Sequence, residues 1–126
     1  RKIATNRNKI KIHNKDALEF LGNISKNLPK KTLIYLDPPY YMKGKDLYMN
    51  HYGPEEHKDV AIGIKKLRRN WIVTYDAVPE IKKLYRGYRR KEYFLTYTVG
   101  KISHGREVIF FSKGIENKES VLKLPA

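Results

Sequence analysis

The segment Asp37-Pro38-Pro39-Tyr40 places a carboxylate, two prolines and an aromatic ring next to one another. Proline has a fixed φ and no backbone N–H group, so the pair forms a rigid turn whose carbonyl oxygens are left to accept hydrogen bonds. Asp37 adds two carboxylate oxygens, and Tyr40 adds a flat ring with a polar tip. The simpler alternative is a Pro-Pro turn that only ends a strand. The position after an apolar strand in a basic α/β chain favours a stiff acceptor array that does chemistry.

The strand that positions this segment is predicted over residues 32–36, where four of the five residues are apolar or aromatic. Such a run is typical of a strand that is buried on both faces of a sheet. In an open α/β sheet, ligands bind beyond the carboxyl ends of the strands. We therefore expect Asp37 to lie at a ligand-binding edge.

Helices are predicted where apolar residues recur at helical spacing behind a capping residue or a proline. Asp16 opens a segment with apolar residues at positions 17, 20, 21, 24 and 28. Its spacing to Glu19 resembles a capping box, and Pro29 marks the stop. Pro54 starts a second helix with its apolar face at positions 60, 61, 64 and 67, and residues 79–85 predict a short third helix.

Further strands are predicted over residues 10–13, 71–75, 93–98 and 108–112. The resulting order β-α-β-α-β-α-β-β indicates an α/β fold with a mainly parallel sheet. The last two strands, joined by a loop that contains Gly100 and Gly105, predict an antiparallel hairpin at one edge. We expect one domain over residues 1–115 and a loosely ordered tail over residues 116–126.

The charge of the chain indicates a polyanionic partner. There are 27 Lys and Arg residues against 13 Asp and Glu residues, which gives a net charge of +14. Nucleic acid is the natural candidate, although scattered lysines also keep a small domain soluble. Two dense clusters favour the functional interpretation: residues 65–69, with four basic side chains, and residues 82–91, with six.

Composition excludes several other classes of protein. The chain contains no cysteine, which removes disulfide frameworks and thiol catalysis, and no apolar run approaches the roughly 20 residues of a membrane span. The first residues lack the apolar region of a secretory signal, so we expect a cytoplasmic protein without a membrane partner. His51 and His57 are not accompanied by further ligands at metal spacing, so we expect no metal site. A first residue other than Met indicates that a segment precedes it in the natural protein.

A resemblance to a known family rests on these motifs. Residues 33–40, Leu-Ile-Tyr-Leu-Asp-Pro-Pro-Tyr, look like the catalytic motif of the amino methyltransferases, and the wider pattern resembles the Dam-type DNA adenine methyltransferases. Residues 14–18 resemble the segment whose acidic residue contacts the adenine ring of S-adenosylmethionine in that family. Residues 52–57, 71–76, 81–85 and 106–109 resemble later blocks, so the likeness covers roughly residues 10 to 112. The glycine-rich cofactor loop and the DNA-recognition domain, which precede the motif in the family, are not found in this chain.

The resemblance implies a partial Rossmann-like methyltransferase fold that transfers a methyl group from S-adenosylmethionine to the N6 amine of an adenine flipped out of double-stranded DNA. The residues that it assigns to catalysis are Asp37, Pro38, Pro39 and Tyr40, and those that it assigns to the cofactor are Asp16, Ala17 and Asp37. Asp16 is equally well explained as a helix cap. Charge and aromatic content add the expected DNA contacts Tyr41, Lys43, Lys45, Lys82, Lys83 and Arg86. Asp76, at the end of the next strand, is expected to be a turn former.

Two alternatives remain beside this function. Related Pro-Pro-aromatic motifs also serve base amines in RNA, which makes an RNA base N-methyltransferase the nearest alternative. A DNA-binding remnant without catalytic activity is the alternative outside enzymes.

Overall fold

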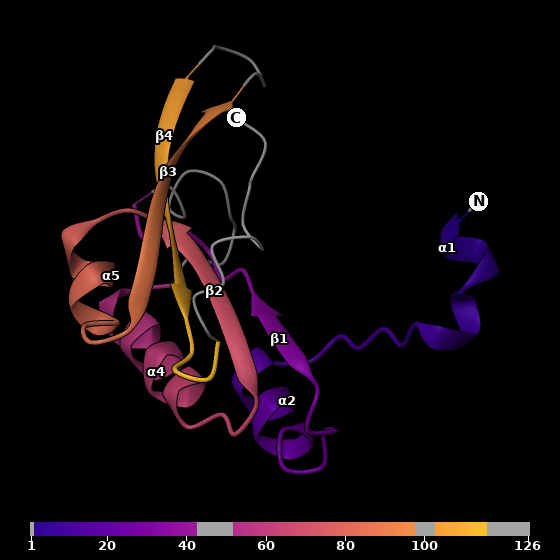
Figure 1. Cartoon of the computed structure of the whole chain (residues 1–126). Helices are drawn as coiled ribbons and strands as arrows, with labels where there is room; N and C mark the ends of the chain where they lie inside the picture. The colour runs from indigo at the N-terminus through magenta and orange to yellow at the C-terminus, as the bar shows by residue number, and fades with distance from the viewer. Residues whose placement is uncertain (1, 43–51, 98–102, 116–126) are drawn as a thin grey trace.

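A four-stranded mixed sheet forms the centre of the fold (Figure 1). The computed structural model describes residues 2–42, 52–97 and 103–115. Their elements are α1 (Lys2–Thr5), the 3-10 helix η1 (Arg7–Lys9), α2 (Ala17–Ile24), β1 (Leu33–Leu36), α4 (Pro54–Lys65), β2 (Asn70–Asp76), α5 (Pro79–Leu84), β3 (Arg89–Tyr97) and β4 (Ser103–Phe111). The α/β class is therefore confirmed. The predicted tail over residues 116–126 lies outside the described residues.

The strand order is β1-β2-β4-β3, and only one of the three pairings is parallel. β1 pairs with β2 in parallel, with α4 as the crossover between them. β4 then runs antiparallel to both β2 and β3, so the last strand is inserted between its two neighbours. The expected mainly parallel sheet is wrong because a single β-α-β crossover supplies a single parallel pair. The antiparallel β3–β4 hairpin at the edge is confirmed.

The helix starts follow from the predicted caps. Asp16 precedes α2, and its Oδ1 accepts a hydrogen bond from the backbone N–H of Glu19 at 3.0 Å. α4 and α5 both begin with proline, whose missing N–H costs nothing in the first turn. α2 ends at Ile24, before the apolar position 28 that sequence spacing assigned to it. The chain turns there, since the N–H of Asn27 bonds to the Ile24 carbonyl.

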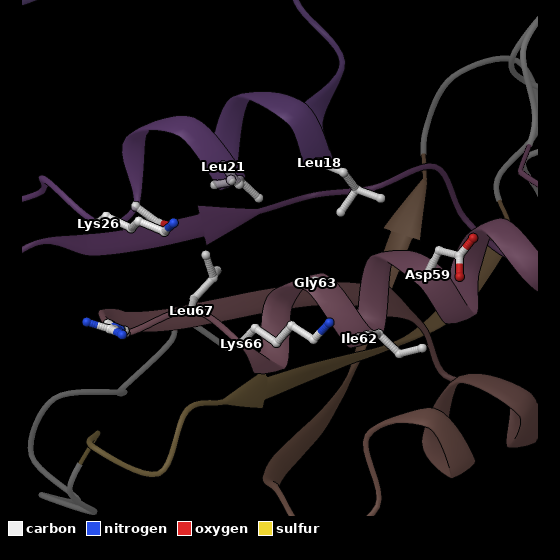
Figure 2. Close-up of a pocket in the computed structure, with 11 residues that line it drawn as sticks. Leu18, Leu21, Lys26, Asp59, Ile62, Gly63, Lys66 and Leu67 are labelled. Atoms are coloured by element: carbon white, nitrogen blue, oxygen red, sulfur yellow. The ribbon is translucent and has the colours of Figure 1, made fainter.

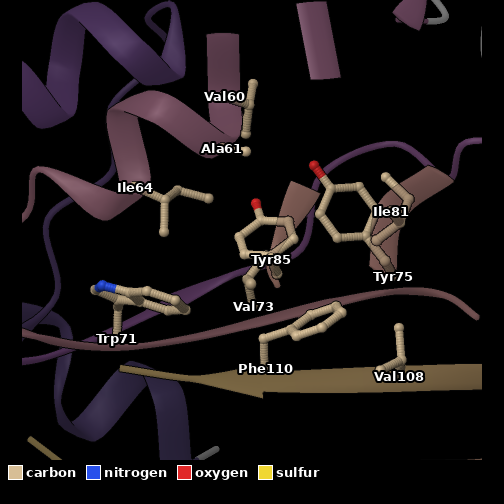
Figure 3. Packing of buried hydrophobic residues seen from close by; sticks show 10 residues of the cluster. All are labelled: Val60, Ala61, Ile64, Trp71, Val73, Tyr75, Ile81, Tyr85, Val108 and Phe110. Carbon is tan, nitrogen blue, oxygen red and sulfur yellow. The ribbon is translucent and has the colours of Figure 1, made fainter. Parts of the chain in front are cut away.

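The hydrophobic core lies on the face of the sheet that α2, α4 and α5 cover. Alternate residues of β2 and β4 point to this face, and an aromatic cluster fills its centre (Figure 3). The buried members of the core are Val60, Ala61, Ile64, Trp71, Val73, Tyr75, Ile81, Tyr85, Val108 and Phe110. Full burial of each large apolar side chain contributes about 1.5–3 kcal/mol. This cluster therefore holds β2 and β4 in a fixed register beneath the helices.

Three expectations about the strands are wrong. Residues 10–13 form no strand, and Ile12 is 90% exposed, because no described strand lies beside them to pair with their backbone groups. β1 is an edge strand rather than one buried on both faces, since Leu33 is 56% exposed and Tyr35 is 62% exposed. The hairpin is longer than expected, and Gly105 pairs with Leu95 inside it instead of lying in the loop. Among the described residues, no helix is long and apolar enough to cross a membrane.

Candidate active site

Asp37 follows the last residue of β1 and is held by the neighbouring strand. The hydroxyl of Thr74, in the middle of β2, lies 2.9 Å from Asp37 Oδ1 and 3.1 Å from the hydroxyl of Tyr35. A hydroxyl has one proton, so when Thr74 donates to Asp37 it accepts from Tyr35. Thr74 is buried, whereas Asp37 is exposed. Thr74 therefore orients the Asp37 carboxylate from the side of the sheet, and the exposed side of the carboxylate is open to a ligand.

The free acceptors of the motif lie on Asp37 and Pro38. Among the described residues, none donates a hydrogen bond to Asp37 Oδ2 or to the carbonyl of Pro38. Proline has no backbone N–H, so neither Pro38 nor Pro39 can donate a hydrogen bond to a neighbouring carbonyl of the motif. The turn thus keeps two acceptors available at the carboxyl edge of the parallel strands.

Tyr40 is anchored through its hydroxyl to a buried carboxylate. Its hydroxyl donates to Glu107 Oε1, and the hydroxyl of Tyr93 donates to Glu107 Oε2 at 2.7 Å. Glu107 lies in β4 and is only 3% exposed. A buried carboxylate is stable when donors satisfy both oxygens, and here two tyrosines do so. The sequence indicated a flat ring with a polar tip at Tyr40, but it could not indicate that Glu107 is the partner of that hydroxyl.

Asp76 holds the residues that follow the motif. Its two carboxylate oxygens accept hydrogen bonds from the backbone N–H groups of Tyr41 and Met42, both at 2.8 Å. Asp76 is 6% exposed, and it faces Glu107 as its register partner across β2 and β4. Asp76 does stand at a turn, as expected, since its carbonyl accepts a hydrogen bond from the backbone N–H of Val78 at 2.9 Å. Its side chain has a second role that was not expected, because it anchors the chain after the motif.

The signal for these two carboxylates was present in the sequence. Glu107 is an acidic residue within a strand that is otherwise buried at Val108 and Ile109, and Asp76 ends a strand with the same character. Acidic residues are almost never fully buried unless they are paired. The pattern alone could not name their partners, since Tyr40 and Tyr93 lie 67 and 14 residues away from Glu107.

A cavity of about 310 Å³ lies directly beside the motif. It brings together the first turn of α2, the end of β1, the motif and the face of α4. The lining residues are Ala17, Leu18, Leu21, Tyr35, Leu36, Asp37, Pro38, Pro39, Tyr52, Val60 and Ile64. Two of the expected cofactor residues, Ala17 and Asp37, thus share one cavity. Asp16 does not line it, because its side chain is exposed and caps α2.

The expected DNA contacts are placed in different settings. The ring of Tyr41 packs 5.1 Å from the ring of His57, and the residue is half-buried. Lys83 and Arg86 are exposed and form no ion pair with the described residues. Lys43 and Lys45 lie outside the described residues.

Lys82 is engaged by an acidic neighbour. Its Nζ lies 2.9 Å from Glu92, which also has Arg90 at 3.6 Å and Arg106 at 3.8 Å. The hydrogen bond from Lys82 is the main reason that the pKa of Glu92 lies below its ordinary value. Part of the charge in this basic cluster is therefore neutralised within the protein.

His57, in the first turns of α4, is fully buried among aromatic rings. The rings of Tyr41, Tyr52 and Tyr75 lie 5.1, 5.6 and 5.7 Å from it, and neither ring nitrogen has a hydrogen-bond partner within the described part of the chain. Burial lowers the pKa of His57 below its ordinary value of 6.5. The imidazole is therefore neutral at neutral pH. Within residues 2–42, 52–97 and 103–115, no group of three or more His, Cys, Asp or Glu side chains could hold a metal ion.

A larger hollow of about 430 Å³ lies between α2 and α4 and excludes the motif (Figure 2). Leu18 and Leu21 of α2 face Gly63 of α4 across it. A Cβ at Gly63 would lie 2.7 Å from Leu18 Cδ2, so a larger residue there would require the Leu18 side chain to move. This hollow lies where α2 packs on α4, whereas Asp37, Pro38 and Pro39 line the smaller cavity.

No protein-family model matches the chain, and no curated protein matches it. The residues of the site and their geometry are therefore the basis for a function.

Proposed function

We propose that this chain carries the methyl-transfer site of an S-adenosylmethionine-dependent DNA adenine N6-methyltransferase, in a partial Rossmann-like fold. The observation that supports the proposal best is the pair of free acceptors on Asp37 and Pro38. These two residues line a cavity of about 310 Å³ and lie close in sequence to Tyr40, which is anchored by Glu107. The residue types predicted this array, and two of its side chains are held by other strands: Thr74 of β2 bonds to Asp37, and Glu107 of β4 bonds to Tyr40.

The chemistry of an exocyclic amine explains the need for two acceptors. The lone pair of the adenine N6 atom is delocalised into the ring, so the amine is a weak nucleophile. Acceptors for both N–H groups favour a more tetrahedral nitrogen and stabilise positive charge as it develops there. Asp37 Oδ2 and the Pro38 carbonyl are suited to these two roles, and Thr74 keeps the carboxylate in place.

The donor set fits the proposed cofactor. The cavity beside the motif has apolar walls from Ala17, Leu18 and Leu21 and one carboxylate, that of Asp37. S-adenosylmethionine supplies an activated methyl group on a sulfonium, so the work left to the protein is orientation and charge stabilisation. Ala17 and Leu18 would line one side of its site, and Asp37 the other.

Tyr40 supports the handling of the base. Extrusion of a base from a duplex costs a few kcal/mol, and stacking on an aromatic ring recovers about 1–3 kcal/mol. A stacking ring has to be held in one orientation to contribute this energy, and Glu107 holds Tyr40 by its hydroxyl. The basic surface of the chain, with a net charge of +14, suits the same polyanion.

The test is methyl transfer from labelled S-adenosylmethionine to DNA. We expect transfer to duplex DNA and none to the same duplex with each adenine replaced by purine, which lacks the 6-amine. Asp37→Ala should reduce the rate by at least about a hundredfold while duplex affinity stays close to that of the parent protein. Asp59→Ala, an exposed aspartate on α4, is the matched control. Near-normal transfer by Asp37→Ala would defeat the catalytic assignment.

The same reaction with single-stranded RNA distinguishes the proposed DNA methyltransferase from the nearest alternative, an RNA base N-methyltransferase. Faster transfer to RNA than to duplex DNA would replace the DNA assignment. Saturable binding of DNA with neither transfer nor binding of S-adenosylmethionine would identify the chain as a non-catalytic DNA-binding protein.

A further inference from the structure

The end of the sheet opposite to the motif holds a third cavity, of about 310 Å³, with basic walls. It lies where β2 begins and β4 ends, beside the last turn of α4. The lining residues are Lys65, Leu67, Arg68, Arg69, Asn70, Trp71, Tyr88, Ser112, Lys113 and Gly114. Four of them are cationic and none is acidic. Three of the four basic residues of the cluster at residues 65–69 line this cavity, and the proposed methyl transfer gives them no role.

The four cations divide into two that serve the fold and two that are free. Arg69 donates from Nε to the carbonyls of Leu28 and Pro29 at 2.8 and 2.9 Å, and Lys65 donates to the carbonyl of Leu84. These carbonyls lie just after α2 and at the end of α5, where carbonyls have no partner within the helix. Lys65 and Arg69 therefore stabilise the fold. Arg68 and Lys113 are exposed and make no ion pair within the described residues. Their charge is available to a ligand.

Trp71, which lines the cavity, carries a further hydrogen-bond donor in its indole N–H. Trp71 is only 2% exposed, and the nitrogen edge of its indole is turned away from the aromatic core (Figure 3). No described residue accepts a hydrogen bond from the indole N–H. An indole nitrogen donates only, so a ligand that meets it there must present an acceptor. Because Arg68 and Lys113 also line this cavity, an acceptor that carries a negative charge is favoured there.

We propose that this cavity binds phosphate groups of a nucleic-acid strand as a second site, separate from the motif. Asn70, at the start of β2, lines this cavity, and Thr74 of the same strand bonds to Asp37 of the motif. The four residue steps from Asn70 to Thr74 span about 13 Å at about 3.3 Å per residue. One phosphate cannot touch both sites, and a strand that reaches both must span about four nucleotides at B-form spacing.

A phosphodiester fits the chemistry of this cavity better than a carboxylate side chain does. Guanidinium groups match phosphate oxygens in a bidentate geometry, as Arg68 allows, and Lys113 adds a point charge. The aromatic ring of Tyr88 lies under Lys113, with 5.9 Å between Nζ and the ring centroid. The repeating charge of a nucleic-acid strand also suits a protein with basic residues at both ends of its sheet.

Trp71 is the only tryptophan of the chain, so the protein carries its own probe. The indole N–H resonance of Trp71 can be followed by NMR during titration with inorganic phosphate and, separately, with an oligothymidylate of about twelve nucleotides. Oligothymidylate contains no adenine, so this measurement is independent of the proposed methyl transfer. We expect the resonance to shift with both ligands, and the oligothymidylate to bind more tightly at low salt.

Charge-matched variants decide the proposal. Arg68→Gln and Lys113→Gln should each weaken binding of the oligothymidylate and lower the slope of log K against log salt by about 0.7 for a lost contact. Lys58→Gln removes the same charge from the exposed surface of α4 and should change neither the Trp71 shift nor the slope by a comparable amount. An indole resonance insensitive to both ligands would overturn the site. Equal loss in all three variants would overturn it as well, since it would indicate only a general effect of net charge.

Discussion

Asp76 and Glu107 face each other as register partners on β2 and β4, and each buried carboxylate anchors one part of the chain after the Pro-Pro pair. Glu107 accepts from the hydroxyl of Tyr40, and Asp76 accepts from the backbone N–H groups of Tyr41 and Met42. The hydroxyl of Tyr93 donates to the second oxygen of Glu107, so each oxygen of the two buried carboxyl groups has a donor. Through these bonds Asp76 and Glu107 fix the position of residues 40–42 relative to β2 and β4.

The first prediction concerns the hydroxyl of Tyr40. Tyr40→Phe keeps the ring and removes one donor to Glu107, so we expect a loss of about 1.5–3 kcal/mol in the free energy of unfolding, typical of a bond to a charged group. The same substitution should cost much less in a Glu107→Gln background, where the charged acceptor is gone. Urea unfolding of the two single variants and the double variant measures this coupling. Additive losses would show that Tyr40 and Glu107 do not interact.

The second prediction concerns the backbone groups that Asp76 holds. Asp76→Asn replaces one acceptor oxygen by a donor, so one of the two N–H groups at Tyr41 and Met42 loses its partner. We expect faster amide hydrogen exchange at one or both of these residues and a lower rate of the proposed methyl transfer. Asp59→Asn, exposed on α4, is the control and should leave both unchanged. Unchanged exchange at Tyr41 and Met42 in Asp76→Asn would contradict the anchoring role.

The third prediction concerns pH and His57. The pKa of His57 is lowered in the folded protein by burial, so the unfolded chain binds more protons between that lowered pKa and the ordinary value of 6.5. The free energy of unfolding should therefore fall as the pH drops through this window and should be restored above it. His57→Phe, which keeps a ring among Tyr41, Tyr52 and Tyr75, should flatten this part of the profile.

Denaturant titrations at several pH values between about 7.5 and 5 make this measurement. His13→Gln, at an exposed position, is the matched control and should retain the slope of the parent protein. A His57→Phe profile with the same slope as the parent would assign the pH dependence to other groups.

The fourth prediction compares the contributions to DNA binding of three basic residues in and just after α5. Lys82 is paired with Glu92, whereas Lys83 and Arg86 are exposed. If this surface contacts duplex DNA, Lys83→Gln and Arg86→Gln should each lower the salt slope by about 0.9, and Lys82→Gln should lower it less. Affinity for a duplex at several salt concentrations gives the three slopes. A decrease for Lys82→Gln as large as for Lys83→Gln would mean that the Glu92 pair opens on binding.

Local patterns in the sequence determine the elements of this fold and part of the site. Capping at Asp16, proline at positions 54 and 79, and the apolar run of β2 depend only on residues close to one another in the chain, so they could be predicted. The motif at residues 37–40 could be recognised for the same reason, because its rigid turn is a property of four adjacent residues.

The tertiary structure decided how these pieces meet. The sheet order β1-β2-β4-β3 places Glu107 beneath Tyr40 and Thr74 beside Asp37, contacts across 67 and 37 residues that no local pattern specifies. The strand predicted at residues 10–13 failed for the converse reason, since an alternating pattern becomes a strand only when a neighbour accepts its backbone hydrogen bonds. Residue types thus set which chemistry is available, and strand pairing sets which side chains are held close enough to perform it.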